Sequence, residues 1–176
     1  MNIGTRNFKL CDLQWITFAA MSLLVIGSVA FDAIETPFGK TDKIIGGAAT
    51  YISLSSSYFT DQVKLVAVVG GDFPKEDIKL LEDHGVDTEG LQIKEDEKSF
   101  FWSGKYHNDM NSRDTLVTEL NVLEHFDPIL PASYQSSEYV MLGNLSPNVQ
   151  RKVIERMDTK PKLIALDTMN FWMDIA

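Results

Sequence analysis

The sequence is poor in three kinds of residue, and each shortage disfavours a class of protein. Its single cysteine, Cys11, rules out an intrachain disulfide and a cysteine-based zinc site, so the fold needs no oxidising compartment. Only 16 lysines and arginines stand against 25 acidic residues, and the net charge of -9 disfavours nucleic acid and anionic membranes as partners. With 11 glycines and 6 prolines in 176 residues, the chain is neither collagen-like nor of low complexity. We therefore expect a cytoplasmic globular protein.

A long apolar run is also missing. The most apolar stretch, residues 15–31, is shorter than the roughly 20 residues that a membrane-spanning helix needs, and Thr17, Ser22 and Gly27 interrupt it. Its second part has the pattern of a buried strand, which leaves residues 1–20 as an N-terminal extension. An upstream start codon, a membrane or partner helix, and a signal segment all remain open as explanations of that extension.

Short apolar strand patterns alternate with helical patterns along most of the chain. The strand patterns cover residues 22–29, 63–69, 139–142 and 163–166. Their brevity and their content of β-branched residues are typical of strands that are buried on both faces. The alternation predicts an α/β fold, Rossmann-like, with three layers around a mostly parallel sheet.

Three helices of this fold carry further expectations. Apolar and small residues at helical spacing predict the buried face of the helix that follows Gly47, namely Ala48, Tyr51, Ile52, Ser55 and Phe59. Asp72 precedes the next helical pattern, and we expect its side chain to cap that helix. Ser146 and Pro147 have the order of an N-cap followed by a first helical residue.

Two other segments have a different pattern. Residues 31–45 contain turn residues that suit a hairpin, and in residues 91–120 apolar and polar side chains alternate around a turn-like stretch. Alternation is typical of strands with one solvent-exposed face, so these segments are expected to form a separate small sheet.

Polar residues follow several of the predicted strands. Asp32 comes after the first strand, Asn144 after the strand at 139–142, and Asp167 with Asn170 after the strand at 163–166. Ligands of open α/β sheets bind beyond the carboxyl ends of the strands, and carboxylates and amides suit a polyhydroxylated, sugar-like ligand. Each residue also has a structural explanation, as a turn residue or a helix cap.

Four segments together resemble the ribokinase-like (phosphofructokinase B-type) carbohydrate kinase family. They are VIGSVAFD at 25–32, IGGAATYIS at 45–53, VVGGDF at 68–73 and ALDTMN at 165–170. The resemblance covers residues 21–176 and implies the amino-terminal half of such a kinase, a partial domain truncated before the nucleotide-binding half. It also implies that the small sheet, residues 31–45 and 91–120, closes over the substrate as a lid.

The resemblance assigns roles to residues. It implies that Asp32, Gly46 and Gly47 bind the hydroxyls of a sugar or nucleoside, that Asn144 is a polar pocket residue, and that Asp167 and Asn170 lie near the transferred phosphoryl group. The spacing of the last pair is one residue longer than in the family pattern.

A second departure from the family concerns a residue four positions after the Gly-Gly pair. Tyr51 stands where the signature carries an asparagine, and its hydroxyl and ring offer a different substrate contact. The family's Gly-Ala-Gly-Asp segment, with the catalytic base, occurs nowhere in the chain and is expected beyond residue 176. ATP and Mg²⁺ are therefore implied by the family, without a nucleotide site in this chain, and no metal site is expected from its three histidines.

These observations predict an ATP-dependent phosphotransferase acting on a hydroxyl of a sugar, with this chain as its substrate-binding half and inactive by itself. One alternative is a nucleoside kinase, which stacking of Tyr51 and Phe101 on a base would favour. Another is a non-catalytic carbohydrate-binding remnant. Phe100, Phe101 and Trp102 are candidates for substrate contacts in the lid or for a dimer seam, so a homodimer formed through the small sheet is a further expectation.

Overall fold

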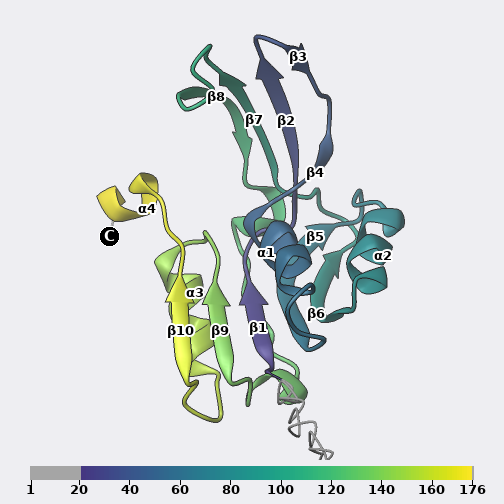
Figure 1. Cartoon of the computed structure of the whole chain (residues 1–176), viewed down its shortest axis with the longest axis vertical. Helices are drawn as coiled ribbons and strands as arrows, with labels where there is room; N and C mark the ends of the chain where they lie inside the picture. The colour runs from purple at the N-terminus through teal and green to yellow at the C-terminus, as the bar shows by residue number, and fades with distance from the viewer. Residues whose placement is uncertain (1–20, 176) are drawn as a thin grey trace, which may run out of the picture.

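The computed structural model describes residues 21–175; residues 1–20, with Cys11 and the expected extension, and Ala176 lie outside the described residues. A five-stranded parallel sheet forms the body of the molecule (Figure 1). Its strands, in spatial order, are β10 (Leu163–Leu166), β9 (Tyr139–Leu142), β1 (Leu23–Ile26), β5 (Val63–Gly70) and β6 (Val86–Lys94).

Both faces of this sheet are covered except at its edge strand β10, whose four residues are all exposed, so the expectation of a buried strand at 163–166 was wrong. Helices α1 (Ala48–Ser56) and α2 (Lys75–Asp83) pack on one face, while α3 (Pro147–Glu155) and an irregular segment with two short 3₁₀ turns, η1 (Asn121–Leu123) and η2 (Ala132–Tyr134), cover the other. Neighbouring residues of a strand point to opposite faces, so Val25 joins one core cluster and Leu24 and Ile26 join the other. The predicted three-layer α/β fold is confirmed, and the short helix α4 (Asn170–Ile175) follows β10.

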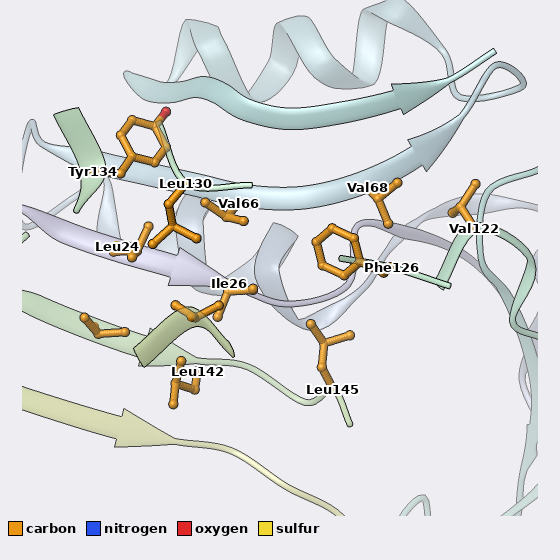
Figure 2. Packing of buried hydrophobic residues seen from close by; sticks show 12 residues of the cluster. Leu24, Ile26, Val66, Val68, Val122, Phe126, Leu130, Tyr134, Leu142 and Leu145 are labelled. Atoms are coloured by element: carbon orange, nitrogen blue, oxygen red, sulfur yellow. The ribbon is translucent and has the colours of Figure 1, made fainter. Parts of the chain in front are cut away.

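The core on the α3 face contains a tyrosine that the sequence patterns did not predict. Tyr134 is fully buried, and Figure 2 shows its ring among the aliphatic side chains of β1, β5 and the irregular segment. Its hydroxyl donates to the Asp87 carbonyl at 2.9 Å and accepts from the Gly90 N–H at 3.4 Å. Those two backbone groups flank a register shift between β5 and β6, so the hydroxyl satisfies polar groups that the irregular ladder leaves unpaired.

A second sheet extends beyond the carboxyl ends of the parallel strands (Figure 1). Its strands are β3 (Gly39–Lys40), β2 (Ala30–Thr36), β7 (Phe101–Tyr106) and β8 (Arg113–Glu119), in that order, and β4 (Ile44–Gly46) also pairs with β2. The expected small sheet is present, but its expected start at residue 91 was wrong. Residues 91–94 belong to β6, because the edge strand of the main sheet also has one exposed face and so shows the same alternation.

The predicted buried face of α1 was also wrong. The helix buries Ala49, Thr50 and Ser53, whereas Tyr51 is 55% exposed and Phe59, beyond the helix end, is 76% exposed. The cause is the close approach of α1 to β1, since a Cβ on Gly27 would lie 3.0 Å from the Ala49 Cβ. Only small side chains fit between two elements at that distance.

Asp72 does not cap α2, whose N-cap residue is Pro74. Its Oδ1 instead accepts hydrogen bonds from the Ser99 N–H and the Ser99 hydroxyl, both at 2.7 Å. The Ser99 hydroxyl in turn accepts from the Gly70 N–H at 2.9 Å. Asp72 therefore joins the end of β5 to the segment that enters β7 of the second sheet. The predicted Ser146 cap of α3 is confirmed.

Candidate functional site

Asp32 and the Gly-Gly pair come together where the second sheet leaves the body. Asp32 is half-buried on β2, opposite Ile44 of β4. A Cβ on Gly46 would lie 2.1 Å from Asp32 Oδ2, and the Gly47 N–H donates a hydrogen bond to the Asp32 carboxylate. The first glycine therefore makes room for the carboxylate, and the second holds it in place.

Gly47 has a second, conformational reason to be glycine. Its φ is +95°, and a Cβ there would lie 2.3 Å from the Ser28 carbonyl oxygen. Ser28 then receives the next two backbone N–H groups of α1, from Ala48 to its Oγ at 3.0 Å and from Ala49 to its carbonyl at 2.9 Å. Because Asp32 and Ser28 already accept from the start of α1, this helix end is not an open anion cradle.

Ser28 was not among the residues chosen from the sequence. The signal that points to it is its position directly after Gly27 at the end of the first strand, where a side-chain oxygen reaches the start of the following helix.

Burial governs the charge state of Asp32. Desolvation raises the pKa of this carboxyl group above its usual 3.8, and the hydrogen bond from the Gly47 N–H opposes that rise only in part. At neutral pH a buried carboxylate with one protein donor keeps oxygen lone pairs that can accept hydrogen bonds from ligand hydroxyls.

The register of the second sheet puts Asp32 and Phe101, which the sequence analysis had grouped as substrate-binding residues, on opposite faces. Asp32 is opposite Trp102, whereas Phe31 is opposite Phe101, so Phe101 lies on the face away from Asp32. Phe101 packs against the core cluster that includes Phe31, and the Lys43 ammonium lies 5.5 Å from its ring centroid. Trp102, a second candidate from the same aromatic run, is an aromatic side chain on the Asp32 face.

Tyr51 and Asn144 lie near the start of α1. Tyr51 follows Gly47 by one helical turn, and its hydroxyl donates to the Ile45 carbonyl at 3.2 Å. Asn144 lies two residues after the end of β9. Gly143, between them, packs on α1, and a Cβ on it would lie 3.4 Å from the Ala48 Cβ. The Asn144 Oδ1 accepts a hydrogen bond from Trp172 Nε1 at 2.9 Å.

Asp167 and Asn170 lie farther along the same edge. They follow β10, which is two strands and hence about 10 Å from β1. Asp167 is exposed, its N–H donates to the Leu142 carbonyl at 2.8 Å, and its carbonyl accepts from Gln150 Nε2 at 3.0 Å. Asn170 begins α4. The fold thus puts both residues on the expected edge but apart from Asp32.

Within residues 21–175 no three histidine, cysteine or acidic side chains gather in a way that would hold a metal ion. No helix within the same range is long and apolar enough to cross a membrane.

Comparisons with known proteins give curated relatives and similar solved structures, although no family model matches the chain. The chain is 31% identical over 148 residues to the cytidine kinase of Thermococcus kodakarensis, covering 84% of this chain and 51% of that protein. It is 34% identical over 104 residues to the nucleoside kinase of Methanothermobacter thermautotrophicus, covering 51% and 34%. The ribokinase of Cryptococcus neoformans, solved with ADP, matches 86% of this chain and 51% of its own at 20% identity, with a TM-score of 0.69.

The chain thus spans about half the length of the first relative and of the ribokinase structure, and a third of the second relative. Sequence similarity to a cytidine kinase and the match to a solved ribokinase together support a ribokinase-like carbohydrate kinase fold, which the chain carries over about half the length of those proteins.

Proposed function

We propose that the protein containing this chain transfers a phosphoryl group from ATP to a hydroxyl of a ribose-containing substrate, and that this chain binds the substrate. The names of the two curated relatives, a cytidine kinase and a nucleoside kinase, favour a nucleoside over a free sugar. The sheet formed by β2, β3, β4, β7 and β8 would act as a lid over the bound molecule.

One observation carries the proposal, which is the seating of Asp32 against the Gly-Gly pair. Gly46 leaves space for the carboxylate and the Gly47 N–H fixes it, while Ser28 accepts from the next two N–H groups of α1. A fixed carboxylate accepts hydrogen bonds and repels phosphate, so this end of the site suits hydroxyl groups. Asn144 and Tyr51 lie at the same edge and would supply further polar contacts.

The described residues suit the hydroxyl-bearing substrate better than they suit ATP and Mg²⁺. The chain has no Gly-Ala-Gly-Asp segment, and residues 21–175 contain no cluster of metal-binding side chains. The assignment of Asp167 and Asn170 to the neighbourhood of the phosphoryl group stays a proposal, supported by their position on the shared edge of the sheet.

Calorimetric titration of the chain with ribose and with cytidine tests the binding role. Asp32→Asn should weaken binding of both by about tenfold or more, because the amide offers fewer acceptor lone pairs and no charge. Asp61→Asn is the matched control, since Asp61 is exposed and precedes β5 at the opposite edge of the sheet. Equal affinities for wild type and Asp32→Asn would remove Asp32 from the site.

The transfer reaction needs its own measurement. The full protein that contains this chain should be incubated with ATP, Mg²⁺ and a panel of nucleosides and sugars. Mass spectrometry should then detect a product heavier by one phosphoryl group. Absence of any phosphorylated product from a folded protein that binds these ligands would favour the non-catalytic binding role.

A homodimer through the second sheet is supported by the exposure of its edge strand. Every residue of β8 is exposed, Leu116 by 54% and Val117 by 39%. Leu116→Lys should therefore increase the monomer fraction in light scattering, and a wild-type chain that is monomeric at all concentrations would contradict the dimer.

A further inference from the structure

The backbone that leads into Asn144 is fixed on both sides. The Gly143 N–H donates to the Ile26 carbonyl at 2.6 Å, and the Gly143 carbonyl accepts from Gln150 Nε2 at 2.9 Å. Gln150 is buried, and its amide nitrogen also donates to the Asp167 carbonyl at 3.0 Å. The ends of β9 and β10 are thereby tied together, so the fold sets the position from which the Asn144 side chain starts.

The orientation of the Asn144 amide is set by an indole. Trp172 belongs to α4, beyond the carboxyl end of β10 (Figure 1), and its Nε1 donates to Asn144 Oδ1 at 2.9 Å. An indole N–H can only donate, so the amide atom that faces it must be the oxygen. Asn144 therefore keeps its NH₂ group for another partner, and within residues 21–175 that group makes no hydrogen bond to the protein.

The start of α1 connects Asn144 with the part of the site that holds Asp32. Asn144 is partly exposed, and Gly143 before it packs against Ala48 in the first turn of α1. The Gly47 N–H, at the same helix start, donates to the Asp32 carboxylate. One end of the proposed sugar site thus offers a group that only accepts hydrogen bonds, and the other offers a group that is turned to donate.

The two groups ask different things of a ligand. A carboxylate binds hydroxyl protons, whereas an amide NH₂ group binds an oxygen or nitrogen lone pair. A hydroxyl oxygen, a ring oxygen or a carbonyl oxygen can face such an NH₂ group, and an ammonium or amide N–H cannot. The direction in which the amide is turned therefore decides which ligand atoms Asn144 accepts as partners.

We propose that Trp172 is a positioning residue that makes Asn144 a hydrogen-bond donor to the substrate. The proposal rests on the proposed function, because Asn144 must face the bound molecule. Trp172 acts through Asn144 in this arrangement, by occupying the amide oxygen and leaving the NH₂ group to the substrate.

Asn144→Asp tests the donor role in a calorimetric titration, with the tighter-binding of cytidine and ribose as the probe. The carboxylate can still accept from Trp172, but at neutral pH it has no proton to donate. Asn144→Asp should therefore weaken binding as much as Asn144→Ala does, by about five- to tenfold, the value of one net hydrogen bond. Wild-type affinity in Asn144→Asp would overturn the proposal, because an acceptor role survives this substitution.

Trp172→Phe tests the positioning role, since it keeps an aromatic ring and removes the indole N–H. It should weaken binding by about two- to fivefold in the wild-type background and have no effect in the Asn144→Ala background. A merely structural role would lower the affinity equally in both backgrounds, and that result would overturn the proposal. Met173→Ala is the matched control, because Met173 is 63% exposed on the same helix, and it should bind like wild type.

The outcomes separate this proposal from the proposed function. A wild-type chain that binds neither cytidine nor ribose overturns both. A chain whose affinity falls in Asp32→Asn but not in Asn144→Asp keeps the proposed function and overturns the roles of Asn144 and Trp172. Loss of affinity in Asn144→Asp with wild-type affinity in Trp172→Phe overturns the positioning role of Trp172.

Discussion

Replacing Gly46 by alanine should lower the free energy of unfolding, because the new methyl group displaces the Asp32 carboxylate. Gly46 does not have a positive φ, so its backbone accepts an alanine without strain. The new methyl group would lie 2.1 Å from Asp32 Oδ2 and 2.4 Å from Asp32 Cγ, which is far inside van der Waals contact. The carboxylate must therefore rotate away, and it then leaves the Gly47 N–H.

The size of the effect follows from that lost hydrogen bond. A hydrogen bond to a charged group contributes about 1.5–3 kcal/mol. Replacing glycine by alanine restricts the unfolded chain and returns about 0.4–1 kcal/mol. The net loss is about 1–2 kcal/mol, which lowers the Tm of a chain of this size by roughly 2–8 °C.

Thermal melts of Gly46→Ala, Asp32→Ala, the double variant and Gly39→Ala measure the loss of Tm and test whether it comes from the contact between Gly46 and Asp32. Gly39→Ala is the control, because a Cβ on Gly39 meets no atom within 4 Å. The double variant Asp32→Ala/Gly46→Ala completes a cycle in which the cost of the methyl group should nearly vanish once the carboxylate is gone. Additive effects of the two substitutions, or a Gly46→Ala Tm equal to that of wild type, would refute the contact between Gly46 and Asp32.

Four further predictions concern three residues, Asp32, Tyr134 and Asp72. Because burial raises the pKa of Asp32 above 3.8, ligand affinity should fall on acidification at a higher pH than for an ordinary aspartate, and calorimetry of Asp32→Asn should show no such step. The same raised pKa makes Asp32's contribution to the unfolding free energy greatest at acid pH, and that contribution should decline as pH rises from 3.8 through the folded pKa. Tyr134→Phe should lower the unfolding free energy by about 1–3 kcal/mol in a urea titration, because backbone groups at the register shift lose their partner; an unchanged midpoint would contradict this. Asp72→Ala should cost about 2 kcal/mol and Asp72→Asn much less, because an amide oxygen still accepts from Ser99; equal melts of the two variants would contradict it.

The parallel body of the fold could be predicted from local pattern alone. Strands β1, β5, β9 and β10 are short apolar runs, and segments with the spacing of helices lie between them, so the pattern of apolar residues predicts which segments are strands and which are helices. The sequence also singled out Asp32 and the Gly-Gly pair, because a carboxylate after an apolar strand pattern and paired glycines are visible in one dimension, and the structure brings these residues into contact.

Only the tertiary structure decided which residues share a face. Whether Phe101 or Trp102 lies beside Asp32 depends on a one-residue choice of register between β2 and β7, and the composition of the segment does not reveal it. The spacing between α1 and β1 likewise decided that Ala49 is buried and Tyr51 exposed, against the apolar pattern. Tyr134 and Asp72 acquired their partners across distant segments, because backbone groups at a register shift and at a sheet junction needed hydrogen bonds that no local sequence supplies.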